Sequence, residues 1–542
     1  MRFAIPRLLL SLTFTFLLLA CVAANGAKMN GHPTVKWILA CQNKDGGFGL
    51  YPGDGSNLLA TFGAVQTLHR LNIPVKKADK VTAWILTRQN KDGGFKSRWG
   101  VWPDTSTLEQ TYYAIMTLAI TGFGKVDKSP IIAFIDSKHR TDGGYEKDPY
   151  FEPAITERSC IGETFWALSA LSALGEKQKE AKRTTAFILA RENNQTNPGC
   201  FGYRNTVLDF ATPEGKGSIL TTGLALSSLA LLGVAPDQPE KNLTYILNQQ
   251  QTSGEFSKGM GLNREYNDRH IGRMTEAAAA LQGLNILVGF PKDPAGLTSW
   301  ISSCQTPDGA FGGRPGNPSD MPAVYDAVLA LTLLKQPIPI PAKPVEPILD
   351  TVTFKPAFFT EQMNPNDADE MRYLFRIVRS VKAKSSTATE WAFALKLMEW
   401  VNDNMIFGET RNHSGAAIIL AGFGMCGPQA RAYVSLANMA GIQSRRIGLA
   451  GHSATESLIN GKWVVIDPVF NDYGHDCEGN LYSAWDIHEN FLKNGDIKLT
   501  VFGDWRYENI ETEMPNGNVW EIRPETKIED LIKPGAYTKD NY

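Results

Sequence analysis

Long apolar segments recur at regular intervals along the first part of the chain. Six of them have nearly the same length and span residues 58–71, 108–120, 161–174, 219–232, 274–287 and 323–334. They are rich in Ala, Leu and Ser and are apolar on most sides, which is typical of helices that are buried all round. We therefore expect six buried helices between residues 33 and 335.

A glycine-rich turn precedes each of these segments, and a further helix-like segment precedes each turn. The turns read QNKDGGFG, QNKDGGF, RTDGGY, NPGCFG, QTSGEF and QTPDGAFG, and their matching glycines are Gly46, Gly93, Gly143, Gly199, Gly254 and Gly309. Asp-Gly and Gly-Gly pairs supply the positive φ that a tight turn needs. Two helices per repeat and six repeats predict an all-α, closed α/α toroid over residues 33–335, with an inner ring surrounded by an outer ring.

The inner helices carry polar residues at one matching position. Where the first helix has Ala60, the other five have Gln110, Glu163, Thr221, Glu276 and Asp326. Burying a charge without a partner is costly, so these side chains need either water or counter-charges. They could line a wet central cavity that binds a ligand, or they could form an internal salt-bridge or water network with Arg158 or Arg273. The pattern leaves both interpretations open.

The repeats resemble the prenyltransferase and squalene-cyclase family, whose members carry a Gln-x-x-x-Gly-x-aromatic turn in an α/α toroid. The resemblance covers a little over half of the chain and implies the fold, while the same toroid hosts several chemistries. Protein prenyltransferases hold zinc with an Asp-x-Cys pair and a His, but this chain has only the segment Glu157 to Cys160 and, in the last repeat, Asp326. The Asp-x-Asp-Asp proton donor of squalene-hopene cyclases is also missing. We therefore expect no metal and no cofactor.

A proline-rich stretch separates the toroid from a different kind of domain. Residues 336–347 cannot continue a helix and predict an extended linker. Helical periodicity resumes over residues 368–381 and 390–404. We expect a second domain over residues 348–475 and an appended segment over residues 476–542.

Three motifs follow one another in this second domain. They read GFGMCGPQARA around Cys426, GHSATE around His452 and KWVVIDP around Asp467. In this order they resemble the transglutaminase-like superfamily over about residues 385–475. The resemblance implies a papain-like α+β domain in which Cys426 is the nucleophile, His452 the base and Asp467 the orienting carboxylate.

The residues around Cys426 agree with that role on physical grounds. Glycines end the structure before it, and residues 430–440 form a good helix, so Cys426 is predicted at a helix N-terminus. The helix dipole favours a thiolate there, and free N–H groups of the same turn could stabilise an oxyanion. Pro428 fits the first helical turn, where its missing N–H is not needed.

His452 and Asp467 are predicted on two strands joined by a tight hairpin. Asn460-Gly461 is a strong signal for a two-residue turn, which pairs residue 459 with residue 462. This register sets Asp467 opposite Ala454 and diagonal to His452, on the same face of the sheet. An imidazole and a carboxylate can meet across such a diagonal.

The N-terminus predicts export. Arg2 and Arg7 precede an apolar run over residues 8–20, which is short for a membrane span but suits a secretory signal. The sequence LLAC, ending at Cys21, resembles a bacterial lipobox, which gives a signal peptide over residues 1–21 and a lipid-anchored Cys21. Cleavage after residues 22–24 is the alternative, and it gives a secreted or periplasmic protein. The mature chain is expected to be extracytoplasmic in both cases.

Composition adds few restrictions. The chain has 54 Lys and Arg against 56 Asp and Glu, for a formal net charge of -2, so it has no electrostatic reason to bind nucleic acid. Export makes disulfides possible, but no Cys-x-x-Cys pair is present, and buried thiols are the preferred interpretation of the remaining cysteines, which are Cys41, Cys160, Cys200, Cys304 and Cys477. The tripeptides beginning at Asn194 and Asn242 would be glycosylation acceptors only in a eukaryotic secretory route.

These patterns lead to three hypotheses for function. The first is acyl transfer through a Cys426 thioester on a protein or peptide substrate, giving amide hydrolysis or cross-linking, with a toroid that presents substrate or binds a small or lipidic ligand. The second is a catalytically inert binding or scaffold protein. The third, and least favoured, is a prenyltransferase-like or terpenoid-cyclase-like toroid enzyme.

Overall fold

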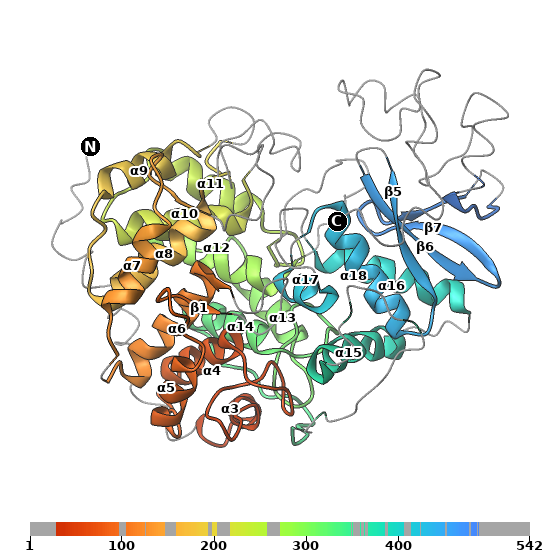
Figure 1. Ribbon diagram of the computed structural model, residues 1–542, viewed down its shortest axis with the longest axis horizontal. Helices are drawn as coiled ribbons and strands as arrows, with labels where there is room; N and C mark the ends of the chain where they lie inside the picture. Colours follow the sequence, from red (N-terminus) through yellow and green to blue (C-terminus); the bar gives the residue numbers. More distant parts are fainter. Residues whose placement is uncertain are drawn as a thin grey trace. The chain divides into compact units, whose positions relative to one another are not determined.

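The chain divides into two compact units (Figure 1). One comprises residues 1–98, 102–260 and 270–351, and the other comprises residues 99–101, 261–269 and 352–542. The computed structural model describes residues 29–96, 105–124, 126–146, 159–192, 198–202, 217–256, 272–347, 350, 358, 363, 367–384, 389–405, 414–422, 424–449, 452–475, 479–484 and 486. The predictions for the signal peptide, Cys21, Arg158, Cys477 and most of residues 476–542 lie outside the described residues.

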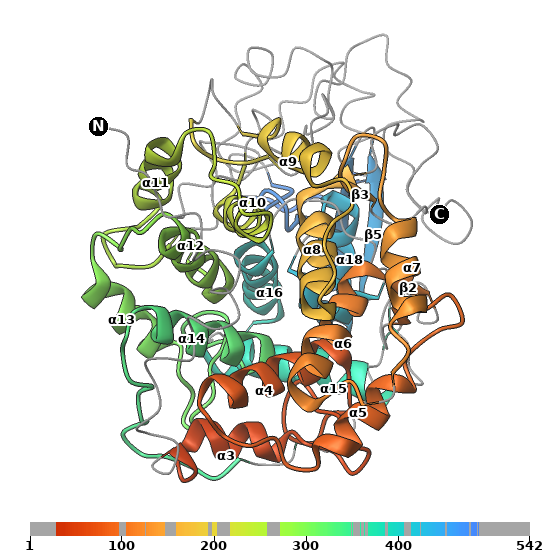
Figure 2. The same ribbon diagram turned by 90° about the vertical axis from the view of Figure 1, so that its left-hand side faces the viewer.

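The first unit is a double ring of helices. The outer helices are α3 (Pro33–Ala40), α5 (Ala78–Leu86), α7 (Ser129–Ser137), α9 (Ala181–Leu189), α11 (Pro239–Asn248) and α13 (Pro294–Ser303). The inner helices are α4 (Leu58–Arg70), α6 (Leu108–Thr121), α8 (Ile161–Leu174), α10 (Ile219–Leu231), α12 (Met274–Ile286) and α14 (Met321–Leu333). Each inner helix contacts the next, and α14 contacts α4, so the ring is closed (Figure 2).

The inner helices confirm the prediction made from the apolar segments. Their ends differ from the predicted ends by at most two residues. Small residues allow some of them to approach closely, since a Cβ on Gly223 of α10 would lie 2.7 Å from the carbonyl oxygen of Ala279 in α12. Two short hairpins extend the glycine-rich turns, pairing β1 (Phe95–Lys96) with β2 (Ser106–Thr107) and β3 (Tyr145–Glu146) with β4 (Ser159–Cys160).

The repeat glycines sit where the chain has no room for a side chain. All six have φ between 85° and 102°. A Cβ on Gly46 would lie 2.5 Å from the carbonyl carbon of Lys80 in the next outer helix, and each later glycine meets the following outer helix in the same way. Gly309 of the last repeat meets Pro33 of the first, and Thr34 Oγ1 donates to the Gly309 carbonyl oxygen at 2.6 Å. The turns therefore join neighbouring repeats and also close the ring.

The proline-rich stretch lies on this closing junction. In the first repeat Gln42 Nε2 donates to the carbonyl oxygen of Lys76, just before the next outer helix, at 2.9 Å. In the last repeat Gln305 Nε2 donates instead to the carbonyl oxygen of Pro339 at 2.7 Å. The Val345 N–H donates to the carbonyl oxygen of Pro307 at 2.9 Å. This stretch therefore takes the place of the segment that precedes the next outer helix in the first repeat.

In its described residues, the second unit combines four helices with one antiparallel sheet. The helices are α15 (Ala368–Lys384), α16 (Glu390–Asn404), α17 (Gly415–Ala421) and α18 (Cys426–Met439). The strands are β5 (Ser444–Leu449), β6 (His452–Ile459), β7 (Lys462–Asp467) and β8 (Asp472–Tyr473), in that order across the sheet. Helix α18 packs against β5 and β6, and α15, α16 and α17 all contact α18. The predicted fold class, an α/α toroid with an α+β domain, is confirmed.

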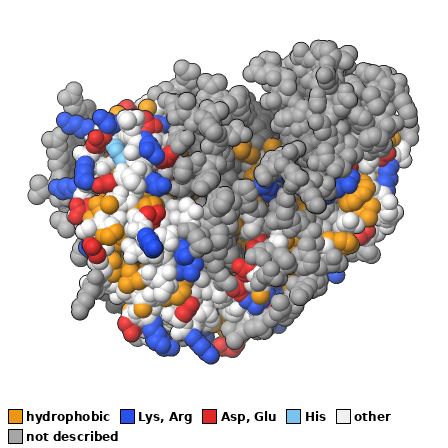
Figure 3. Space-filling model, in the orientation of Figure 1, with side chains coloured by type: hydrophobic (Ala, Val, Ile, Leu, Met, Phe, Trp, Pro, Cys, Tyr) orange, Lys and Arg blue, Asp and Glu red, His pale blue; other side chains and the backbone are white. Residues whose placement is uncertain are grey.

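The described surface of the toroid carries charges of both signs. Figure 3 shows Lys and Arg side chains interspersed with Asp and Glu on the face in view, without a large field of one sign. Among the helices of the described residues, none is long and apolar enough to cross a membrane.

Candidate active site

Cys426 begins helix α18, as the sequence predicts. Met425 is the N-cap residue, with φ -67° and ψ -173°, and its side chain makes no capping hydrogen bond. Cys426 is half-buried, whereas Cys41, Cys160, Cys200 and Cys304 are buried, as predicted. The positive end of the α18 dipole favours the ionised form of a thiol at this position. Cys426 is therefore the described cysteine best placed to act as a nucleophile.

The loop that leads into α18 is fixed by two contacts. Gln429 Nε2 donates to the carbonyl oxygen of Gly424 at 2.7 Å, which ties the helix back to its own entry. A Cβ on Gly424 would lie 2.8 Å from Cβ of Pro428 and 2.9 Å from Cε of Met405. Only glycine fits at this position without displacing its neighbours, so the helix start has a defined place.

Strands β6 and β7 have the register predicted from Asn460-Gly461. Ile459 pairs with Lys462, and Thr455 pairs with Ile466. Asn460 and Gly461 have φ of 49° and 81°, as a two-residue hairpin turn requires. His452 begins β6, where its backbone pairs with Leu449 of β5. The side chain of His452 lies outside what the structure describes, so its role as base stays a prediction.

Asp467 ends β7 and is fully buried. Its Oδ1 accepts hydrogen bonds from the backbone N–H groups of Val469 at 2.8 Å and Phe470 at 3.2 Å. The turn that follows β7 therefore sets the orientation of the carboxylate.

The chain neighbours of Cys426 and His452 lie against each other. A Cβ on Gly427 would lie 3.9 Å from Oγ of Ser453 and 3.8 Å from Nη1 of Arg446 in β5. The first turn of α18 therefore packs beside the beginning of β6. Neither Ser453 nor Arg446 was singled out by sequence reasoning, and only the pairing of β5 with β6 could have drawn attention to them.

Glu163, Thr221 and Glu276 have partners inside the ring. Glu276 is fully buried and forms an ion pair with Arg273, with Nε and Oε2 3.2 Å apart. Glu163, also buried, accepts from the thiol of Cys160. Thr221 Oγ1 donates to the carbonyl oxygen of Phe201 at 2.7 Å. Gln110 is buried on α6. These contacts agree with an internal network and leave the ligand-cavity interpretation untested.

Asp326 differs from the other candidates in its position and its electrostatics. The prediction that it lies at the matching position is wrong, because α14 begins at Met321 and therefore has Ala323 there. Its Oδ2 accepts from Oγ1 of Thr275 at 3.0 Å. Burial raises the pKa of Asp326 to about 7. A cluster of aromatic rings that the sequence reasoning missed lies nearby on α4, α6 and α14, where Phe62 is 5.3 Å from Tyr112 and 5.1 Å from Tyr325 between centroids. Within the described parts of the chain, no three His, Cys, Asp or Glu side chains are grouped as metal ligands.

Fold and site together define a protein of two units, a helical toroid and an α+β unit that presents a thiol at a helix N-terminus. The chain belongs to the family described as the prenyltransferase alpha-alpha toroid domain, whose model matches residues 10–105, 76–160, 154–346 and 257–402. Residues 376–468 match the transglutaminase-like superfamily. Both resemblances found in the sequence are thereby confirmed.

Three solved structures that match parts of this chain have low sequence identity to it and low TM-scores. The geranylgeranyltransferase-I of Candida albicans is 16% identical over 51% of this chain and 83% of its own, with a TM-score of 0.38. The type II terpene cyclase MstE of Scytonema is 13% identical over 56% and 95%, with a TM-score of 0.38. A candidate cysteine protease from Cytophaga hutchinsonii is 19% identical over 18% and 37%, with a TM-score of 0.17. No curated protein matches significantly.

Proposed function

We propose that this protein is an exported transglutaminase-like cysteine enzyme that transfers acyl groups from protein or peptide substrates. In this proposal Cys426 is the nucleophile, His452 the general base and Asp467 the carboxylate that orients the imidazole. The observation that carries it is the position of Cys426, a half-buried thiol that opens α18 in a unit matching the transglutaminase-like superfamily. The buried, turn-anchored carboxylate of Asp467 supports it further.

The proposed reaction proceeds in two halves. His452 takes the proton of the Cys426 thiol, and the thiolate attacks the carbonyl carbon of an amide. N–H groups of the first turn of α18 stabilise the oxyanion. The C–N bond then breaks, the departing amine takes the proton from His452, and a thioester remains on Cys426. Water or a second amine, deprotonated by His452, attacks the thioester and regenerates the thiol, giving hydrolysis or cross-linking.

The remaining parts of the proposal concern the toroid and the location of the protein. We propose that the toroid presents substrate or binds a small or lipidic ligand, and that Cys21 carries a lipid anchor on an extracytoplasmic protein.

Asn242, in one of the two potential glycosylation tripeptides, is buried in the folded toroid. Its amide donates hydrogen bonds to Glu192 and to the carbonyl oxygen of Gly199 at 2.7 and 2.8 Å, so this asparagine is not open to glycosylation in the folded toroid.

The proposal is tested by the alkylation rate of Cys426 as a function of pH. Mass spectrometry would follow the modification of the native protein by iodoacetamide between pH 5 and 9. An active site predicts an apparent thiol pKa clearly below the usual value of about 8.5, and a return toward that value in His452→Ala. A thiol that titrates as an ordinary cysteine in both proteins would favour the inert scaffold. Incorporation of a fluorescent primary amine into casein, compared with release of casein peptides, would then separate cross-linking from hydrolysis.

A further inference from the structure

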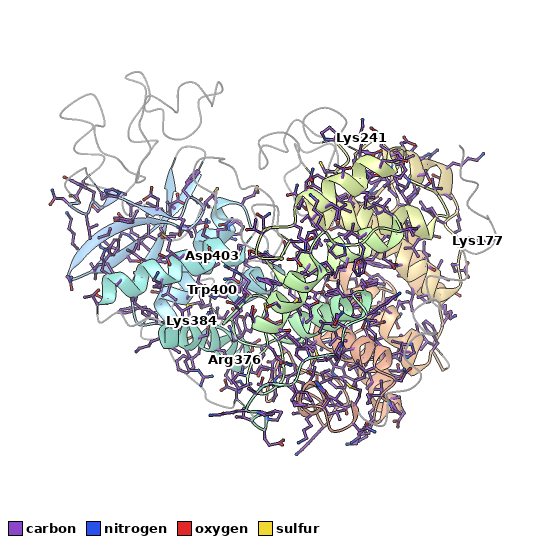
Figure 4. All side chains as sticks on the ribbon, turned by 180° about the vertical axis from the view of Figure 1, so that it is seen from behind. Lys177, Lys241, Arg376, Lys384, Trp400 and Asp403 are labelled. Atoms are coloured by element: carbon purple, nitrogen blue, oxygen red, sulfur yellow. The ribbon has the colours of Figure 1, made fainter. Side chains whose placement is uncertain are left out.

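Helix α16 contributes a buried amide to the turn that follows Asp467. Asn402 is almost completely buried, and its Nδ2 donates to the carbonyl oxygens of Pro468 at 3.0 Å and Val469 at 2.9 Å. Figure 4 labels Trp400 and Asp403, which come before and after this residue on α16. One side chain thus satisfies two consecutive buried carbonyls with a single amide group.

The same turn holds the carboxylate of Asp467 from its other side. The N–H of Val469 donates to Oδ1 of Asp467, while the carbonyl oxygen of Val469 accepts from Asn402. Residue 469 is therefore fixed at both of its backbone polar groups. Since its N–H sets the position of Oδ1, any displacement of this turn is passed on to the carboxylate.

The sheet alone does not fix this turn. Strand β8 pairs with β7 only at Ile466 with Tyr473 and at Asp467 with Asp472, so residues 468–471 form the loop between the two strands. Pro468 has no N–H and offers the loop only a carbonyl. The anchor to α16 therefore restrains a segment that the β-ladder does not restrain.

We propose that Asn402 is a positioning residue for the active site, which fixes the turn after β7 and through it the orientation of the Asp467 carboxylate toward His452. This inference rests on the proposed function of the Cys426, His452 and Asp467 site. In this proposal Asn402 does not act by contact with the substrate or the reacting atoms. Its effect on chemistry passes entirely through Asp467.

Removing the amide should change reactivity as well as stability. Asn402→Ala leaves two buried carbonyls without donors, so the turn relaxes toward water or new partners. The carboxylate then loses its fixed orientation and stabilises a protonated His452 less well. Because a less stable His452 imidazolium stabilises the thiolate less, the pKa of the Cys426 thiol should rise. At a pH below the pKa of the Cys426 thiol, we expect the alkylation rate to fall about tenfold, the change in thiolate fraction that a rise of one unit in the thiol pKa produces there.

Asn438 provides a matched control. It is a buried asparagine of α18 in the same unit, and it binds the backbone of Ser444, donating to the carbonyl oxygen at 3.1 Å and accepting from the N–H at 2.8 Å. Asn438→Ala removes a comparable pair of buried hydrogen bonds far along the chain from Asp467. It should lower the melting temperature and leave the pH profile of Cys426 alkylation unchanged.

The decisive experiment measures this pH profile in the full chain for Asn402→Ala, Asp467→Asn and the double variant. If Asn402 acts through Asp467, the double variant reacts at the rate of Asp467→Asn alone. Asn402→Ser, which keeps one donor, should fall between the wild-type protein and Asn402→Ala, and it serves if the alanine variant does not fold. The inference would be overturned if Asn402→Ala lowered the alkylation rate of Cys426 equally in the wild-type and the Asp467→Asn background. It would also be overturned if the pH profile of Asn402→Ala matched that of Asn438→Ala.

The profile of the wild-type protein separates this inference from the proposed function. An ordinary thiol pKa for Cys426 that His452→Ala does not change would overturn the proposed function and the role of Asn402 with it. A lowered pKa that depends on His452 and Asp467 but not on Asn402 would overturn only the positioning role.

Discussion

Gly309, the glycine of the last repeat, packs directly against Pro33, at the start of the first outer helix. A Cβ at position 309 would overlap Cβ of Pro33. An alanine at this position would also have to adopt a φ of +85°. We expect Gly309→Ala to lower the free energy of unfolding by about 2–4 kcal/mol, because the strain and the overlap add at one site. Urea unfolding followed by circular dichroism would measure this loss.

Gly313 is the control for this substitution. It lies a few residues further along the chain, and nothing is within 4 Å of the position that its Cβ would take. Gly313→Ala should therefore change the free energy of unfolding by less than about 0.5 kcal/mol. Equal losses for the two variants would show that the junction between the last and first repeats does not stabilise the ring.

Val288 occupies a position with positive φ that is held by glycine in some repeats and by Asn72 and Lys335 in two others. It follows α12 with a φ of 56° and is 94% exposed, while Gly175 and Gly233 hold the matching positions after α8 and α10 with φ of 82° and 70°. The N–H of Gly289 closes this helix end on the carbonyl oxygen of Leu284 at 2.7 Å. A β-branched residue is strained in this conformation. We expect Val288→Gly to raise the melting temperature, with a gain in stability of about 1 kcal/mol.

The reciprocal substitution checks the explanation. Gly233→Val places the same β-branched side chain at a φ of 70°, with nothing within 4 Å of its Cβ, so the backbone conformation is the main change. It should lower the melting temperature by about as much as Val288→Gly raises it. If neither Val288→Gly nor Gly233→Val changed the melting temperature, the loops after α10 and α12 would accommodate valine without strain.

The local elements of both units could be predicted from the sequence because their signals are local. Apolar periodicity located the inner helices, and the positive φ required by Asn460-Gly461 fixed the register of β6 and β7. The glycines before Cys426 predicted that a helix begins at this residue. Each of these depends on residues within a few positions of one another.

The contacts that were missed join segments far apart in the chain. Asn402 binds the carbonyl oxygens of Pro468 and Val469 from more than sixty residues away, and no spacing in the sequence marks that pairing. The packing of residues 336–347 on the ring also depends on where the sixth repeat ends relative to the first. A composition that excludes a helix says nothing about which surface an extended segment will contact.

His32 is expected to make the stability of the toroid depend on pH. It caps α3, where its Nδ1 accepts from the N–H of Thr34 at 3.2 Å and its Nε2 lies 3.3 Å from the carbonyl oxygen of Ile338. Burial lowers the pKa of His32 below its usual value of 6.5. The neutral form is thus favoured in the folded state, and this contribution is complete above the unfolded-state pKa and is lost as the pH falls below it.

We therefore expect the urea midpoint of the wild-type protein to fall between pH 7.5 and 5 by more than that of His32→Asn. Asparagine can cap a helix without titrating, so the variant can keep the cap of α3, while it loses the proton linkage and the contact with Ile338. Parallel pH curves for the two proteins would show that protonation of His32 has no part in acid destabilisation.

Asp326 is expected to act in the opposite sense. Burial raises its pKa to about 7, so the folded state favours the protonated acid, and the stability that this provides is lost as the pH rises from the unfolded value of about 4 through 7. Asp326→Asn keeps an acceptor for Thr275 and cannot ionise. The variant should unfold at a higher urea concentration than the wild-type protein at pH 8, and the difference should shrink at pH 5. A difference that is the same at both pH values would show that ionisation of Asp326 is not its source.

Gly424 and Gly427 lie on either side of Cys426. Substitutions at these two glycines distinguish the effect of moving the start of α18 from the effect of crowding around the thiol. Gly424→Ala would bring a Cβ to 2.8 Å from Pro428 and 2.9 Å from Met405, so the start of α18 must shift. Gly427→Ala meets only Arg446 and Ser453 at 3.8 and 3.9 Å, which is ordinary van der Waals contact. We expect Gly424→Ala to lower the alkylation rate of Cys426 near pH 7 and to cost about 1–3 kcal/mol of stability, with little change in Gly427→Ala. A larger loss of alkylation rate in Gly427→Ala than in Gly424→Ala would contradict this expectation. It would mean that crowding between α18 and β6, rather than the position of the helix N-terminus, determines the reactivity of the Cys426 thiol.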